Sequence, residues 1–160
     1  MAQKMKNRRP QRTKKTALVK KASGQSKYAS YDDWKPYMPE WLMVIRKAVD
    51  RGDLVKAKQL LNELLPEETI RQKLDGHSTE IIFFIYYEIS ILCFITELHE
   101  EALEYCLKAV EIREVGGIYN QIGLIYRSKN ECSKAIEYLT KAVQLEPNTI
   151  NIWNNLALCL

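Results

Sequence analysis

Residues 116–149 read GGIYNQIGLIYRSKNECSKAIEYLTKAVQLEPNT, and this stretch decides the fold. Four residues spaced i, i+3, i+4 and i+7 share one stripe of a predicted first helix: Tyr119, Ile122, Gly123 and Tyr126. The following Ser128-Lys129-Asn130 predicts a turn, in which Asn130 is best able to adopt a left-handed backbone. A second helix presents three residues to the first, namely Ala135, Leu139 and Ala142, and Pro147 ends it. The stretch therefore predicts a pair of antiparallel helices.

The same pattern returns along the chain at a nearly fixed step. Ala102 and Ala109 recur 33 residues later as Ala135 and Ala142. An aromatic residue returns in the same way, as Tyr86, Tyr119 and Trp153. A period of about 34 residues marks stacked helix pairs, because each pair buries its apolar face only against its neighbours. The chain is therefore predicted to be all-α, an α-solenoid of antiparallel helix pairs.

The pattern of residues 116–149 resembles that of the tetratricopeptide repeat (TPR) family. The family's eight signature places alternate bulky and small side chains and end on proline, and they are filled here by Tyr119, Ile122, Gly123, Tyr126, Ala135, Leu139, Ala142 and Pro147. Small residues at these places let two helices approach closely, while aromatic rings fill the space between pairs. The resemblance implies a TPR-like right-handed superhelix across residues 37–160.

Three further units fit the resemblance less well. Residues 83–115 place seven residues in register: Tyr86, Ile89, Ser90, Cys93, Ala102, Cys106 and Ala109. There Glu114 stands where proline is expected. Residues 37–71 resemble a degenerate unit, in register at Trp41, Gly52, Ala57 and Leu61, and residues 72–82 intervene before the next. Residues 150–160 begin an incomplete unit with Trp153, Leu156, Ala157 and Leu160, so either a longer protein continues from them or they find a partner in another chain.

Charge separates the chain into two parts. Residues 1–27 hold ten Lys and Arg residues and no acidic one, whereas the other 133 residues carry 14 basic and 20 acidic residues, a net charge of −6. Residues 1–31 have little to bury and are predicted to be a disordered basic tail. The run Arg8-Arg9-Pro10-Gln11-Arg12-Thr13-Lys14-Lys15 also matches a nuclear import signal or a nucleic-acid arm. We expect a cytoplasmic protein, with the nucleus as the alternative, because the tail lacks the apolar run of a secretory signal.

Catalytic, metal and membrane motifs are not found in the sequence. Cys93, Cys106, Cys132 and Cys159 have no zinc spacing, so we interpret them as reduced thiols in a core. The two histidines, His77 and His99, have no nucleophile at a recognisable spacing. The apolar residues 81–95 are interrupted by Glu88 and are too short for a membrane span, so they predict a buried helix. We therefore expect no enzyme activity, no cofactor and no metal.

In stacked TPR units, the first helices line a concave groove, and their non-signature faces meet the ligand. The resemblance thus implies a partner-binding groove formed by Tyr87, Glu88, Ile91, Asn120, Gln121, Leu124, Arg127, Asn154 and Asn155, with Phe94 beside them. These residues predict an apolar floor beside a strip of amides, which donate and accept hydrogen bonds and so suit the backbone of a peptide. Plain core packing remains the alternative for Ile91 and Phe94, and surface exposure for the asparagines.

The resulting hypothesis is a non-catalytic scaffold or adaptor that binds a protein or peptide segment in this groove. One TPR variant grips acidic peptide tails with Lys, Asn and Arg on the first helices. The corresponding places here are Tyr87, Ile91, Gln121, Asn151 and Asn155, which supply no cation, so that mode is not expected. Alternatives are the regulatory part of a larger glycosyltransferase or methyltransferase, a nucleic-acid adaptor acting through the tail, and self-association through residues 150–160.

Overall fold

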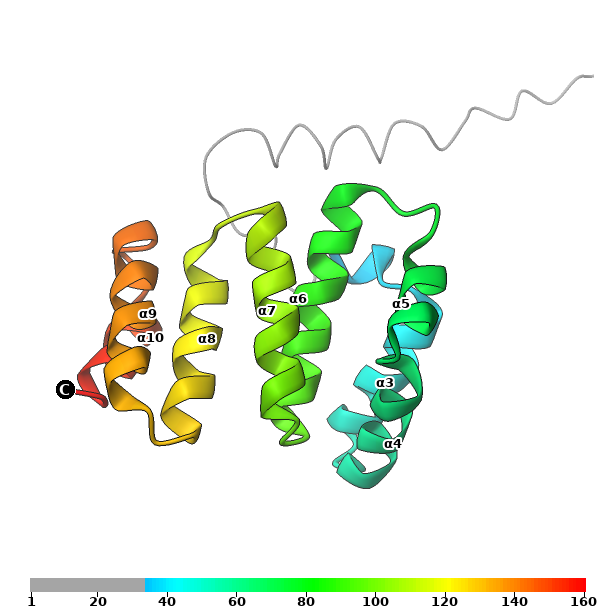
Figure 1. The fold of residues 1–160 in the computed structure, drawn as a ribbon, viewed down its shortest axis with the longest axis horizontal. Helices are drawn as coiled ribbons and strands as arrows, with labels where there is room; N and C mark the ends of the chain where they lie inside the picture. The colour runs from blue at the N-terminus through cyan, green and yellow to red at the C-terminus, as the bar shows by residue number, and fades with distance from the viewer. Residues whose placement is uncertain (1–33) are drawn as a thin grey trace, which may run out of the picture. The chain divides into compact units, whose positions relative to one another are not determined.

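A computed structural model describes residues 34–160, and the predicted disordered tail at residues 1–31 lies outside these described residues. Residues 35–160 form one compact unit (Figure 1). Within residues 34–160 there are helices and no strand: a 3-10 helix at Lys35–Tyr37, then α3 (Glu40–Asp50), α4 (Leu54–Leu64), α5 (Glu67–Leu74), α6 (Thr79–Ile95), α7 (His99–Ile112), α8 (Gly116–Ser128), α9 (Cys132–Leu145) and α10 (Ile150–Ala157). The predicted α-solenoid is confirmed.

The helices pack as consecutive pairs. Within the pairs, α3 packs on α4, α6 on α7 and α8 on α9. Between neighbouring pairs, α3 contacts α6 and α7 contacts α8. The last helix, α10, contacts both α8 and α9. Figure 1 shows α8 standing between the α6–α7 pair and α9. Because each pair makes most of its contacts within itself and with the next pair, stability is approximately a sum of pair and interface contributions.

Small residues set the close approach of α8 and α9. Ala135, Leu139 and Ala142 of α9 are fully buried, as is Ile122 of α8. A Cβ atom built on Gly123 would stand 2.5 Å from Leu139 Cγ and 3.3 Å from the Ala135 carbonyl oxygen. The inward face predicted for this pair is therefore confirmed, and glycine is required where α8 crosses α9.

The three helix pairs share one type of turn. Asn130 has a φ of 60°, as predicted, and Glu97 and Gly52 take the same left-handed conformation with φ of 63° and 77°. In each turn the following residue donates its backbone N–H to the carbonyl five residues earlier: Asp53 to Ala48 at 2.9 Å, Leu98 to Cys93 at 2.8 Å, and Glu131 to Tyr126 at 2.9 Å. This 6→1 bond is that of a Schellman motif at a helix C-terminus. The shared turn puts the three pairs in a common register.

An additional helix lies between the first and second pairs. Residues 72–82, predicted to lie between two units, hold the end of α5 (Glu67–Leu74) and the start of α6 at Thr79. Pro66 precedes α5, with a ψ of 131° that ends the helical path of α4. Proline favours the first turn of a helix because its missing N–H needs no partner there. Ile70 of α5 is 4% exposed, so this extra helix buries an apolar residue of its own.

The apolar helix predicted at residues 81–95 is α6. Its buried residues include Phe83, Ile85, Ile89 and Leu92, and it contacts α3, α4, α7 and α8. Its high apolar content is thus explained by neighbours on several sides. Among residues 34–160, no helix has the length and apolar content that crossing a membrane requires.

The prediction that all four cysteines lie in a core is wrong for two of them. Cys93 and Cys106 are buried between α6 and α7, but Cys132 is exposed and Cys159 is half-buried. Cys132 is the first residue of α9, on the turn side of the pair, and Cys159 follows the end of α10. Burial raises the pKa of both core thiols to about 12. These two thiols are therefore protonated core residues at neutral pH.

Candidate functional site

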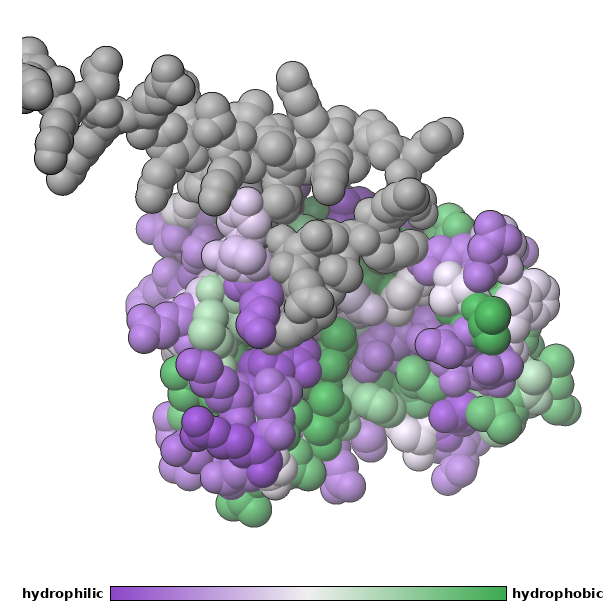
Figure 2. Space-filling model, turned by 180° about the vertical axis from the view of Figure 1, so that it is seen from behind, coloured by the Kyte–Doolittle hydropathy of each residue, from purple (hydrophilic) through white to green (hydrophobic). Residues whose placement is uncertain are grey.

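The predicted groove residues come from α6, α8 and α10, the first helices of their pairs. Figure 2 views the molecule from behind, the side on which α6 lies behind α7 and α10 behind α9 in Figure 1. On this side hydrophobic surface lies beside hydrophilic surface (Figure 2).

Glu88 does not lie on the exposed surface. It is 3% exposed and forms an ion pair with Arg46 of α3, whose side chain is 15% exposed. Burial raises the pKa of the Glu88 carboxyl, and Arg46 opposes the rise. Its carboxylate therefore joins α3 to α6 and lies away from the exposed surface.

Tyr87 packs against the beginning of α8. Its hydroxyl oxygen would stand 3.1 Å from a Cβ atom at Gly117, so any larger residue there would press on the ring. Burial is the main cause that raises the pKa of Tyr87, with smaller contributions from Cys106, Glu146 and Glu88. Tyr87 is therefore a protonated hydroxyl at neutral pH, half-buried between α6 and α8.

Glu146 was not predicted as part of this region. Its carboxylate lies at the N-terminus of α8, where Oε1 accepts the Gly117 N–H at 2.6 Å, and the residue is 8% exposed. A Cβ at Gly116 would be 2.3 Å from that same oxygen. A carboxylate is favourable there because the first N–H groups of a helix have no partner within the helix. The paired glycines of the sequence were the available signal, since they admit this side chain.

The amides of α8 and α10 meet directly. Asn155 Nδ2 donates to Asn120 Oδ1 at 2.8 Å, and both residues are half-buried. Asn154, the neighbouring residue on α10, is exposed and has no such contact among the described residues. Gln121 is 8% exposed, and its buried Nε2 has no hydrogen-bond partner among the described residues. The structure thus brings Asn120 and Asn155 together, and it leaves the Gln121 amide unsatisfied.

The apolar part of the predicted groove is half-buried. Ile91, Phe94 and Leu124 all have intermediate exposure, so each retains some accessible surface. Ile91 and Leu124 lie six residues before the left-handed turn residues Glu97 and Asn130, which makes them equivalent on α6 and α8. Arg127, one turn further along α8, is half-buried and its buried Nη1 has no hydrogen-bond partner among the described residues.

Aromatic rings repeat with the same period behind this face. In the second pair the Tyr86 ring lies 5.7 Å from that of Tyr105, and in the third pair the Tyr119 ring lies 6.2 Å from that of Tyr138. A lysine covers the second ring of each, Lys108 at 4.6 Å and Lys141 at 4.9 Å from the ring centroid. Such pairs add to the apolar burial of the rings. They hold each first helix against its second helix.

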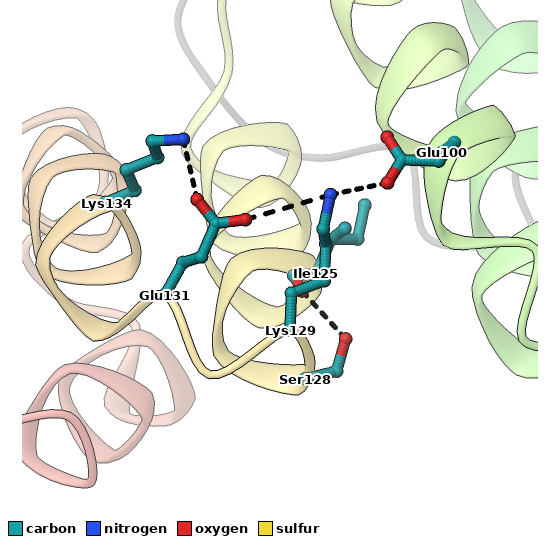
Figure 3. Close-up of polar contacts among 6 residues, drawn as sticks. All are labelled: Glu100, Ile125, Ser128, Lys129, Glu131 and Lys134. Carbon is teal, nitrogen blue, oxygen red and sulfur yellow. Dashed lines mark hydrogen bonds and ion pairs between the residues drawn. The ribbon is translucent and has the colours of Figure 1, made fainter.

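Charged side chains join the turn of one pair to the next. Lys129, at the end of α8, approaches Glu100 of α7 at 2.5 Å and Glu131 at 3.8 Å, while Lys134 contacts Glu131 at 2.6 Å (Figure 3). The hydrogen bond with Glu100 raises the pKa of Lys129, and that from Lys134 lowers the pKa of Glu131. Exposed pairs of this kind contribute little to stability because water and salt screen them.

Comparison with known proteins identifies the repeated unit. Residues 85–115 and 116–149 both match the family model described as Tetratricopeptide repeat. These two units are tetratricopeptide repeats. The resemblance inferred from the sequence is confirmed for α6–α7 and α8–α9. Tetratricopeptide repeats present concave surfaces to other proteins, so in this general sense the chain is a protein-interaction scaffold.

Solved structures agree on the fold of the tetratricopeptide-repeat region. Two crystal structures of MamA superimpose with TM-scores of 0.56 and 0.55, each at 21% sequence identity over 92% of this chain, covering 73% and 68% of the MamA chains. At this identity the likeness concerns the fold alone. No curated protein matches the chain. The binding surface must therefore be argued from its own residues.

Across residues 34–160, no three His, Cys, Asp or Glu side chains are grouped so that they could hold a metal ion. His99 lies beside Phe94, with the ring centroids 5.6 Å apart, and its buried Nδ1 has no hydrogen-bond partner within this range.

Proposed function

We propose that the chain is an adaptor that binds a segment of a partner protein along α6, α8 and α10. The carrying observation is the equivalence of Ile91 and Leu124, two half-buried apolar residues at the same place on neighbouring first helices. We place them in an apolar floor of the proposed surface, with the bonded amides of Asn120 and Asn155 at its α10 end. Apolar contacts give affinity and amides give orientation, which is the usual division in peptide-binding surfaces.

The amide pair favours contact with the main chain of the partner. Asn120 Oδ1 already accepts a hydrogen bond from Asn155 Nδ2. In the proposed complex, Asn120 Nδ2 donates a hydrogen bond to the bound segment and Asn155 Oδ1 accepts one from it. One donor and one acceptor match a peptide unit, which offers one of each. Tyr87, Arg127 and Asn154 lie around the floor and complete the proposed contact surface.

The first helix pair extends the proposed surface. Gly52 forms the same left-handed turn as Glu97 and Asn130, and Arg46 lies six residues before it, in register with Ile91 and Leu124. We infer that residues 37–71 are a divergent third unit stacked before the two matched repeats. α10 begins a further unit after them, at residues 150–160.

A quantitative pull-down tests the groove. The 160-residue chain serves as bait in cell extract, and the proteins it captures are compared with those captured by Leu124→Lys and by the double variant Asn120→Ala with Asn155→Ala. A specific partner should be lost from both. The matched control is Gln144→Lys, which places the same charge on an exposed position of α9. Equal capture by all four proteins, with unchanged melting temperatures, would remove the groove from the proposal.

A further inference from the structure

The last helix carries an apolar stripe on its exposed side. Ile150, Trp153, Ala157 and Leu160 follow one another at steps of three, four and three residues, and all four are exposed. α10 ends at Ala157, but its last turn continues, since Leu160 donates its N–H to the Ala157 carbonyl oxygen at 3.4 Å. These steps place the four side chains on one side of the helix, away from the side that packs on α8 and α9.

The equivalent side of α8 is covered by a second helix. The residues 34 positions before the stripe are Gly116, Tyr119, Gly123 and Tyr126, and α9 packs on the helix that contains them. Tyr119 is 9% exposed, whereas its equivalent Trp153 is 48% exposed. Apolar residues at alternating steps of three and four are also the pattern by which one helix packs along another. The stripe on α10 is therefore suited to contact with a helix.

The chemistry of the stripe favours a copy of itself as the occupant. Residues 150–160 include no charged residue, although residues 28–160 carry a net charge of −6. Charges beside a helix–helix contact select an oppositely charged partner and keep identical copies apart, and α10 has none of them. The exposed polar residues of α10 are Asn151 and Asn154. An amide both donates and accepts hydrogen bonds, so it is complementary to an identical amide.

We propose that α10 docks on α10 of a second copy of this chain, antiparallel to it and about a two-fold axis that passes beside Ala157. A two-fold contact uses the same patch on both copies, so each residue must suit the residues of that patch. Ala157 is the small residue of the stripe, and its place at the crossing lets the two helices approach closely. Trp153 of each copy then lies near Leu160 of the other, so the large apolar side chains cover one another. This association goes beyond the proposed groove and does not depend on it.

Sedimentation equilibrium of the 160-residue chain tests the proposal, with a reducing agent present so that Cys159 cannot link two copies by a disulfide. Contact through one short helix is a small interface, so we expect a reversible dimer whose fraction rises between about 1 µM and about 1 mM. Ala157→Glu and Ala157→Lys should each raise the dissociation constant of the dimer by at least about tenfold, because like charges meet at the axis. Both variants should keep the circular dichroism spectrum of the native chain, since Ala157 is exposed.

An equimolar mixture of the two variants tests the two-fold arrangement itself. Opposite charges meet at the axis in the mixture, so Ala157→Glu and Ala157→Lys should form a heterodimer although neither variant pairs with itself. The matched control is Val55→Glu, which places a charge on an exposed apolar position of α4 and should leave the dimer unchanged. The groove variant Leu124→Lys should also leave the dimer unchanged.

Each contrary outcome identifies a different error. A chain that stays monomeric at every concentration would overturn the proposal and leave the stripe to a helix of another protein. Dimerisation that survives Ala157→Glu would place the contact elsewhere, and an equal loss in Val55→Glu would show nonspecific association. Failure of the mixture to pair would rule out the two-fold contact at Ala157. If the dimer behaves as expected while Leu124→Lys still captures every partner, the groove is wrong and the self-association stands.

Discussion

Gly123 of α8 lies so close to Leu139 of α9 that a Cβ atom at position 123 would stand 2.5 Å from Leu139 Cγ. Leu139 is fully buried and cannot move aside without disturbing α9. The contact lies at the centre of the clearest repeat, and the position of α8 fixes where Asn120, Gln121 and Leu124 point. Stability at this contact and the geometry of the proposed groove are therefore linked.

Gly123→Ala should lower the free energy of unfolding by about 1 kcal/mol, because overpacking typically costs 1–3 kcal/mol and the higher helix propensity of alanine returns about 1 kcal/mol. In a Leu139→Ala background the clash with the side chain is gone and the 3.3 Å contact with the Ala135 carbonyl oxygen remains, so the same substitution should destabilise by less, with an effect close to zero. Urea unfolding of the four proteins measures this double-mutant cycle. Equal effects of Gly123→Ala in both backgrounds would contradict the close contact.

Replacing the turn residue Glu97 by glycine should stabilise the folded chain. It is held at a φ of 63°, which costs a non-glycine residue about 1–2 kcal/mol, and glycine gives back part of this gain as unfolded-state entropy. Glu97→Gly is thus expected to stabilise by about 0.5 kcal/mol. Gly52→Ala, at a φ of 77°, should destabilise by about 1 kcal/mol. Thermal unfolding gives the melting temperature of each variant. A change of the melting temperature in the same direction for both would argue against backbone strain at these turns.

Arg46→Met should make stability depend on pH. Removing one member of a buried ion pair costs about 3 kcal/mol, because the remaining charge is left unpaired. Burial already raises the pKa of Glu88, and without Arg46 nothing opposes that rise. A carboxyl whose pKa is raised on folding stabilises while it is protonated, and this contribution is lost as the pH rises through its folded pKa. The loss should therefore be large at pH 7 and smaller near pH 4.5.

The control for this prediction is the double variant Arg46→Met with Glu88→Gln. It has no ionisable group at the contact, so its unfolding free energy, measured by urea at several pH values, should lack the extra pH dependence. A single variant whose deficit is constant with pH would show that Arg46 acts through packing and not through the charge of Glu88.

The exposed cysteine and the two buried cysteines should differ in their reactivity toward iodoacetamide. Iodoacetamide at pH 8 should label the exposed Cys132, whereas Cys93 and Cys106 should resist until urea unfolds the chain. Burial raises the pKa of these two thiols from 9.0 to about 12, so the folded chain offers little thiolate. Peptide mass mapping after timed labelling measures this. Their contribution to stability is present below pH 9 and is lost as the pH rises toward 12. Fast labelling of Cys106 in the native chain would contradict its burial.

Much of the fold was predictable because it depends on local spacing. The step between Ala102 and Ala135, and the small residue at Gly123, follow from the need of successive helix pairs to nest closely. Asn130 was predictable as a left-handed turn residue because asparagine tolerates that backbone conformation better than most residues. Glu97 was not, since nothing in glutamate favours that conformation, and only closure of the α6–α7 pair imposes it. The helix α5 was missed because its apolar content is too low to stand out.

The sequence by itself determined the repeat, the order of the helices and which helices carry the proposed groove, because side-chain spacing along one chain fixes which face of each helix is apolar. Only the tertiary structure decided which groove residues remain free. Glu88 meets Arg46 from 42 positions away and Asn155 meets Asn120 from 35 positions away, while Gln121 meets no partner among the described residues. Such pairings depend on how neighbouring helices pack in three dimensions, which no single-helix periodicity contains.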